Sequence, residues 1–221
     1  MTRSRGATAL AVTAAAVYVL LTVLVAVGAT ERLDVAAREY FRPDDVWGDL
    51  QIRVDVIVEG LKPVRAVPLL AVFVLAVSAY RRSWRPAAYA ALVLVVAGVP
   101  ALVTKVLLRR TDPHHELSSS GSFPSGHTLV LLVCLGVALL LVRRHPAPWE
   151  WLLVVAADAV MAWALLVQGA HWVTDVIGGA LLGVAALAAT CGSSLRDRAP
   201  ASTAGGTGRP GRPRSAGGPP S

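Results

Sequence analysis

Two histidines of this chain each lie where a polar stretch meets a long apolar one. His127 belongs to the octapeptide GSFPSGHT at 121–128, and His171 opens the stretch HWVTD at 171–175. His171 and Asp175 are four residues apart, so on a helix they share one face. The carboxylate can then accept the Nδ1 proton of the imidazole and leave Nε2 free and nucleophilic. A structural pair is the alternative interpretation, because aspartate also suits the N-terminus of a helix.

The octapeptide around His127 has two compatible interpretations. Ser is a preferred N-cap residue, and Gly and Pro mark the starts of helices, so this stretch predicts that a helix begins here. A helix start also presents unpaired N–H groups and the positive end of the helix dipole, which favour a bound phosphate. The same N–H groups that need a cap can therefore hold an anion when one binds.

Three polar clusters lie at the ends of apolar segments, and we expect them to meet on one side of a membrane. Polar groups beside membrane spans are costly, which favours a functional role for them. One histidine can attack phosphorus while the other protonates the leaving group, and cations can neutralise the phosphoryl oxygens. The clusters are Lys105 with Arg109 and Arg110, Ser125 to His127, and His171 with Asp175.

Apolar helices are the elements that must position these residues. Of the 221 residues, 55% are hydrophobic and 16% are charged, and the mean hydropathy is +0.58. These values indicate a polytopic membrane protein rather than a soluble domain. The predicted fold is all-α, a bundle of six transmembrane helices, and we interpret the first as a retained span rather than a signal peptide. The six segments are 7–28, 63–80, 86–108, 127–142, 149–168 and 172–191.

Arginines in the links between these segments predict the orientation of the bundle. Arg3 and Arg5, the arginines at 81–85, Arg143 with Arg144, and the arginines of the C-terminal tail fall on one side of six spans. By the positive-inside rule, this side should be cytoplasmic and hold both termini, which leaves the polar clusters on the extracytoplasmic face. Much of the net charge of +7 is topological, so we do not interpret it as nucleic-acid binding.

Two regions outside the spans have distinct compositions. The link 29–62 contains apolar residues at helical spacing and predicts a helix along the membrane surface, whose carboxylates we interpret as structural. Residues 193–221 are rich in Gly, Pro and Arg and are predicted to be disordered, which leaves 1–192 as the membrane domain. The apolar residues of the surface helix are Leu50, Val54, Ile57 and Leu61.

Three segments in a fixed order carry a family resemblance. They are KVLLRRTDP at 105–113, PSGHT at 124–128 and GAHWVTD at 169–175. They resemble the signature segments of the type 2 phosphatidic acid phosphatase (PAP2) family, which shares its core with vanadium haloperoxidases. The resemblance covers roughly residues 60–190. It implies an all-helical core and the hydrolysis of a lipid phosphate through a phosphohistidine, with neither a metal nor another cofactor.

The resemblance also implies roles for single residues. His171 would be the nucleophile, His127 the general acid, and Asp175 the partner that orients His171. The residues that would bind the phosphate are Lys105, Ser125 and Gly126, the last through its N–H.

Two positions depart from the family pattern. The pattern has an arginine seven residues after the lysine and another six residues before the third-segment histidine, where this chain has Asp112 and Leu165. Each arginine would add a charge-assisted contact to phosphate. Arg109 and Arg110 are therefore the predicted replacements in substrate binding.

These observations favour an integral membrane lipid phosphatase. A polyprenyl diphosphate or monophosphate, such as undecaprenyl pyrophosphate, and phosphatidic acid are both plausible substrates, because the lipid tail can stay in the bilayer. Alternatives are a catalytically impaired protein that binds lipid phosphate, and a phosphoryl transferase of the same fold. A metal hydrolase is disfavoured, because Asp112, His114 and His115 lack a recognisable ligand spacing.

Overall fold

The structure is a computed structural model that describes residues 2–114 and 121–196. Every regular element in these two ranges is helical, which confirms the predicted all-α fold. The elements are α1 (Thr2–Ala26), α2 (Glu31–Phe41), η1 (Pro43–Asp45), α3 (Asp49–Leu61), α4 (Pro63–Arg81), α5 (Arg85–Leu108), α6 (Gly126–Val142), α7 (Pro148–Gln168), α8 (Val173–Thr190) and η2 (Ser194–Arg196).

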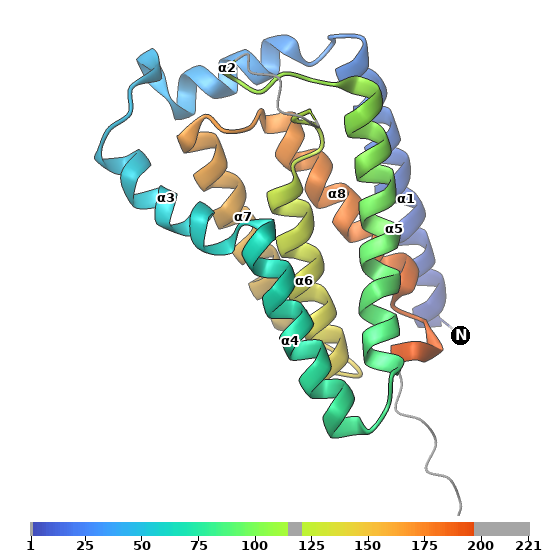
Figure 1. Cartoon of the computed structure of the whole chain (residues 1–221). Helices are drawn as coiled ribbons and strands as arrows, with labels where there is room; N and C mark the ends of the chain where they lie inside the picture. The colour runs from blue at the N-terminus through green and yellow to red at the C-terminus, as the bar shows by residue number, and fades with distance from the viewer. Residues whose placement is uncertain (1, 115–120, 197–221) are drawn as a thin grey trace, which may run out of the picture.

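A helix forms at each of the six predicted apolar segments. Within the described residues, five helices are long and apolar enough to cross a membrane, namely α1, α4, α5, α7 and α8. The sixth, α6, has 17 residues and a length of about 26 Å, which is short of the roughly 30 Å of a bilayer core. α6 occupies the middle of the bundle, where it packs against α4, α5, α7 and α8 (Figure 1).

Close contact between α6 and α8 depends on glycines of α8. A Cβ atom on Gly179 would lie 2.3 Å from the Thr128 hydroxyl oxygen, and a Cβ on Gly178 would lie 2.7 Å from the Phe123 ring. Small residues allow helix backbones to approach closely in membranes. Because Phe123 and Thr128 flank the start of α6, this packing holds the GSFPSGHT segment against the first turns of α8.

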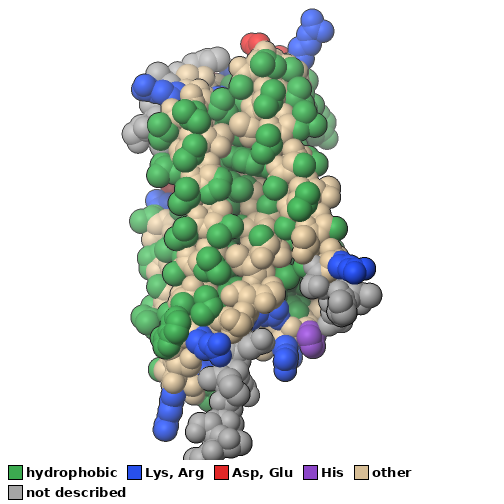
Figure 2. Space-filling view, turned by 90° about the vertical axis from the view of Figure 1, so that its right-hand side faces the viewer, with side chains coloured by type: hydrophobic (Ala, Val, Ile, Leu, Met, Phe, Trp, Pro, Cys, Tyr) green, Lys and Arg blue, Asp and Glu red, His purple; other side chains and the backbone are tan. Residues whose placement is uncertain are grey.

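The outer surface of the bundle is apolar. Figure 2 shows green side chains over the face formed by α1 and α5, with Lys and Arg gathered toward the two ends of the molecule. This distribution suits a surface that faces lipid chains between two polar interfaces. Exposed apolar residues of α1 and α5 include Val12, Val19, Leu20, Val95, Val99 and Leu102.

The predicted surface helix in the link 29–62 is present as α3, preceded by α2. Val54 and Val58 are buried, whereas Leu50 and Leu61 are exposed, because α3 packs one side against α7. α2 crosses the end of the bundle at which α5 ends and α8 begins (Figure 1). The link therefore covers the same end at which the polar clusters lie.

The opposite end of the bundle is joined by arginines that donate to helix carbonyls. Arg196 of η2 donates to the carbonyl oxygens of Leu140, Cys191 and Arg143, each at 2.9 Å. Arg81 donates to the Leu141 carbonyl. η2 lies within residues 193–221, for which the sequence predicts disorder, so this short helix departs from that prediction. The rest of the segment, 197–221, lies outside the described residues.

Candidate active site

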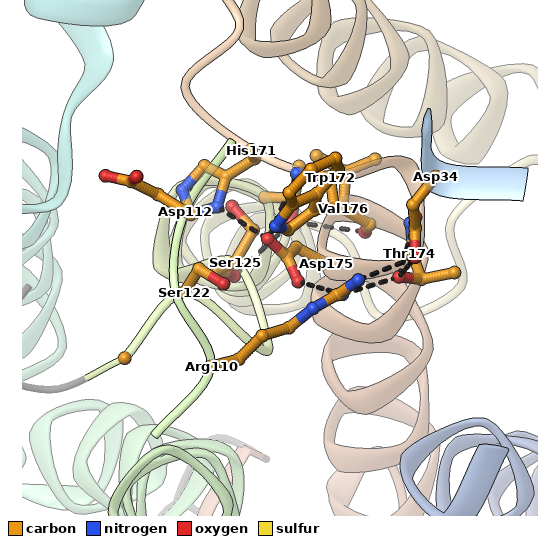
Figure 3. Close-up of polar contacts among 12 residues, drawn as sticks. Asp34, Arg110, Asp112, Ser122, Ser125, His171, Trp172, Thr174, Asp175 and Val176 are labelled. Carbon is orange, nitrogen blue, oxygen red and sulfur yellow. Dashed lines mark hydrogen bonds and ion pairs between the residues drawn. The ribbon is translucent and has the colours of Figure 1, made fainter. Parts of the chain in front are cut away.

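Five parts of the chain meet at the end of the bundle far from the start of α1 (Figures 1 and 3). They are α2, the end of α5 with the loop after it, the loop before α6, the start of α6, and the turn between α7 and α8 together with the first turn of α8. All of the sequence-predicted site residues belong to the last four of these parts. The structure thus brings the three signature segments together at one end of the bundle.

The first turn of α8 positions His171 against Asp175. The Nδ1 atom of His171 lies 3.3 Å from Asp175 Oδ2, and the same oxygen accepts a hydrogen bond of 3.1 Å from the Trp172 N–H. Asp175 is fully buried. A carboxylate held in this way orients the imidazole and favours the tautomer with a proton on Nδ1. Nε2 of His171 is then available as a nucleophile.

His127, in the first turn of α6, faces His171. The two ring centroids are 5.7 Å apart, and the ring planes are inclined by 69°. A group bound between the two rings can be attacked by one imidazole and protonated by the other. The structure therefore brings the two predicted catalytic histidines, from α6 and from the turn before α8, face to face.

The start of α6 carries polar groups that are available to an anion. The first hydrogen bond of α6 runs from the Leu129 N–H to the Ser125 carbonyl. The N–H groups of the helical residues before Leu129 therefore have no acceptor within the helix. The Ser125 hydroxyl is buried without a hydrogen-bond partner among the described residues. A Cβ on Gly126 would meet no atom within 4 Å. The backbone is therefore open to close approach at Gly126.

Lys105 joins α5 to the loop that precedes α6. Its Nζ donates to the Gly121 carbonyl at 2.7 Å, and the Ser122 carbonyl lies at 3.4 Å. Gly121 has a φ of +80°, and a Cβ there would lie 3.1 Å from the Lys105 carbonyl oxygen. Glycine is therefore required by both the backbone conformation and the space. The half-buried ammonium holds the loop and places a positive charge beside the histidines.

Arg110 reaches the site, where its guanidinium contacts two carboxylates. Nη1 donates to Asp175 Oδ1 at 2.7 Å, and Nη2 donates to Asp34 Oδ2 at 2.6 Å. The guanidinium carbon also lies 5.4 Å from the centre of the Trp172 ring. Arg109, by contrast, is exposed and ends α5 in a left-handed conformation with a φ of +45°. The two predicted replacement arginines therefore lie in different surroundings.

Asp34 of α2 is a site residue that sequence reasoning missed. It is 1% exposed and accepts hydrogen bonds from the Thr174 N–H and hydroxyl as well as from Arg110. Glu31, Asp34 and Arg38 recur at helical spacing, but such spacing also describes a solvated helix face. The sequence contains no sign that Asp34 is buried against a residue 140 positions away.

The remaining candidates lie around this centre. Asp112 accepts a hydrogen bond of 3.0 Å from the His114 N–H, and His114 Nε2 lies 3.4 Å from Nη1 of Arg42. His115 lies outside the described residues. Leu165, at the position of a family arginine, is fully buried in the apolar core. Across 2–114 and 121–196, no group of three His, Cys, Asp or Glu side chains forms a metal-binding cluster.

Comparison with known proteins identifies the family. A model of the PAP2 superfamily matches residues 15–196 of this chain. The fold is also similar to the crystal structure of a transmembrane PAP2-type phosphatidylglycerolphosphate phosphatase from Bacillus subtilis, with a TM-score of 0.70 and 20% sequence identity over 81% of this chain and 93% of that one. A search of curated proteins finds no sequence that matches. With most of its length matched by the family model, the chain belongs to the PAP2 superfamily.

Proposed function

We propose that this protein is an integral membrane phosphatase that hydrolyses a lipid phosphate monoester or diphosphate through a phosphohistidine. The observation that carries the proposal is the pairing of His171 with Asp175, opposite His127 and beside the open start of α6. Membership of the PAP2 superfamily supports lipid phosphatase activity. The proximity of His171 and His127 supports the assignment of one as the nucleophile and the other as the acid.

In the proposed reaction, His171 Nε2 attacks phosphorus and the bond from phosphorus to the leaving oxygen breaks. Protonated His127 gives its proton to that oxygen, which leaves as an alcohol or a lipid phosphate. Water then attacks the phosphohistidine and passes a proton to His127, so that inorganic phosphate is released and both histidines return to their starting states. Asp175 stabilises the positive charge that develops on His171 during attack.

The phosphate oxygens would be held by Lys105, by the Ser125 hydroxyl and by the N–H groups at the start of α6. A buried hydroxyl without a partner costs free energy, and an anion at the helix start would offset this cost. We propose that Arg110 acts through Asp175 rather than on the phosphate, because its guanidinium already bridges two carboxylates. Of the two expected replacement arginines, Arg109 is the one whose exposed side chain is left to approach a substrate.

We propose that the site faces the extracytoplasmic side and that both termini are cytoplasmic. The end opposite the site carries the links α4–α5 and α6–α7 with their arginines, together with Arg196. The positive-inside rule places such an end in the cytoplasm. The substrate headgroup would then come from the outer leaflet, with its lipid chains left in the bilayer.

Phosphate release by the purified protein, measured with EDTA present, tests this function. The panel contains phosphatidic acid, a polyprenyl monophosphate and diphosphate, and phosphatidylglycerolphosphate, which is the substrate named for the similar protein. We expect turnover on at least one lipid that survives EDTA and is lost in His171→Ala. His145→Ala is the matched control, because His145 is exposed in the link between α6 and α7.

Other outcomes would identify the alternatives. Binding of lipid phosphate without turnover would indicate the impaired binding protein. Transfer of phosphate to an added alcohol in preference to water would indicate the transferase. Complete loss of activity with EDTA, restored by a divalent cation, would contradict the metal-independent reaction.

A further inference from the structure

We propose that Asp34 is a positioning residue for the reaction, because its charge prevents Arg110 from drawing Asp175 away from His171. This inference rests on the proposed function and deepens it. Asp34 lies on α2, outside the three signature segments, and among the described residues its hydrogen bonds join it to Arg110 and Thr174 rather than to either histidine. Figure 3 shows Arg110 between the two carboxylates, with Asp34 on one side and Asp175 on the other.

Arg110 is shared between two buried carboxylates. Its Nη2 is bonded to Asp34 and its Nη1 to Asp175, at 2.6 and 2.7 Å, while the two aspartates are 1% and 0% exposed. A guanidinium usually binds one carboxylate through two parallel hydrogen bonds. Here each of its terminal nitrogens serves a different partner, so Asp175 receives one bond from Arg110 through Oδ1.

The two oxygens of Asp175 therefore have separate tasks. Oδ1 accepts from Arg110, whereas Oδ2 accepts from the Trp172 N–H and faces Nδ1 of His171. If Arg110 bound Asp175 through both nitrogens, it would compete with His171 for Oδ2. The pull of Asp34 on Nη2 prevents this competition.

Thr174 fixes the direction of the bridge. Its hydroxyl accepts a hydrogen bond of 2.7 Å from Arg110 Nη1, so its single hydrogen is left for Asp34, whose oxygens both lie at 2.9 Å. The Thr174 N–H, in the first turn of α8, also donates to Asp34 at 3.0 Å. Asp34 thus accepts a hydrogen bond from an N–H group at the start of α8 that has no acceptor within the helix. It thereby ties the Arg110 guanidinium to α8, the helix that carries Asp175.

Charge balance leads to the same conclusion. The buried pair carries two negative charges, and Arg110 supplies one positive charge. With Asp34 present, Arg110 and the two aspartates together keep one negative charge, which stabilises His171 when it becomes positive during attack; the positive charge of Lys105 is the same with or without Asp34. With Asp34 neutral, Arg110 and Asp175 would cancel, and His171 would lose this stabilisation at the moment when attack requires it.

The test compares Asp34→Asn with Glu31→Gln in the purified full-length protein. Both variants remove one negative charge from α2, but Glu31 is exposed. For Asp34→Asn we expect kcat to fall about tenfold, the effect of one charged hydrogen bond on a transition state. KM should stay within about twofold, because the phosphate-binding groups are unchanged. Glu31→Gln should match the wild type in both constants.

The Arg110 variants show whether Asp34 acts through the guanidinium. Arg110→Lys keeps the charge but cannot span both carboxylates, so it should also lower kcat without raising KM, and it tests the bridge even if Asp34→Asn does not fold. The kcat of the double variant Asp34→Asn/Arg110→Gln should be no lower than that of the less active of its two single variants, Asp34→Asn and Arg110→Gln, because the two residues act as one unit. Losses that multiply, or a kcat of Asp34→Asn equal to the wild type, would overturn the proposal.

A second measurement does not depend on turnover. ¹⁵N NMR of histidine-labelled protein, assigned with His171→Ala, reports the protonation and hydrogen bonding of His171 Nδ1. We expect the Nδ1 resonance of His171 to move in Asp34→Asn and to stay in place in Glu31→Gln. An active wild type with an unmoved resonance contradicts this inference alone. An inactive wild type contradicts the proposed function, while the resonance still decides whether Asp34 controls the contact between His171 and Asp175.

Discussion

The two ends of the helix bundle both contain arginines that join several helices, but the partners differ. At the end with η2, Arg196 donates to carbonyl oxygens near the ends of α6 and α8. At the end with the histidines, Arg110 donates to two buried carboxylates. Helix C-termini leave carbonyls without partners, so the first arrangement completes the fold. The second arrangement sets the charge beside His171, which we propose as the nucleophile.

Unsatisfied groups show the same contrast. Among the described residues, the buried Ser125 hydroxyl at the start of α6 has no hydrogen-bond partner and the backbone is open at Gly126, whereas Arg196 and Arg81 donate to carbonyls at the end of that helix. Polar groups that lack partners in the free protein are those that a ligand can engage. We therefore expect one end of α6 to serve binding and the other to serve stability.

The largest expected effect is that of the nucleophile. His171→Ala should lower kcat by about 10³-fold or more, while its melting temperature stays close to that of the wild type. The measurement is phosphate release together with thermal unfolding in detergent. Equal turnover in His171→Ala and His145→Ala would show that the paired histidines do not carry the reaction, and the contrast between the two ends would then have no catalytic meaning.

The Ser125 hydroxyl tests whether the start of α6 binds the substrate. Ser125→Ala should raise KM about tenfold, since it removes a hydrogen bond to a charged group. It should leave stability unchanged or slightly higher, because the lost hydroxyl has no hydrogen-bond partner within residues 2–114 and 121–196. Steady-state kinetics and thermal unfolding measure the two effects. A marked loss of stability with an unchanged KM would mean that the hydroxyl serves the fold.

Arg196 tests the opposite end. Arg196→Ala should lower the free energy of unfolding by about 2 kcal/mol, because it frees several helix carbonyls, and kcat per folded molecule should not change. Denaturant unfolding and activity normalised to folded protein give the two values, with the exposed Arg144 as the control position. A change in kcat at constant stability would show that this end influences the chemistry.

Two glycines of the GSFPSGHT segment give the smallest expected effect. Gly121→Ala should destabilise the protein by about 1 kcal/mol, because Gly121 has a φ of +80° and a Cβ would crowd the end of α5. Gly126→Ala should leave stability unchanged, since its Cβ meets open space, and should raise KM by narrowing the approach to the helix start. Thermal unfolding of both variants gives the two melting temperatures, and equal values would contradict the predicted difference in stability.

The sequence was informative where local order decides the structure. Long apolar runs predicted the helices, and the spacing of His171 and Asp175 predicted a pair that shares one helix face. Neighbours that are distant in sequence decide two other features. The short helix α6 lies in the core of the bundle, and Leu165 is buried. The structure brings Arg110 to Asp175 and Asp34, but the sequence did not predict these two carboxylate partners, because they are 65 and 76 positions away.

By itself, the sequence determined a bundle of apolar helices suited to a membrane, and it placed His171 and Asp175 on one helix face, because hydrophobic periodicity and short-range spacing act within single helices. The tertiary structure decided which charges meet. A guanidinium can bind phosphate or a carboxylate equally well, so its partner follows from the packing of α2 across the end of α5 and the start of α8. Long-range packing of this kind brings Asp34 to Arg110 and gives Asp175 two separate tasks.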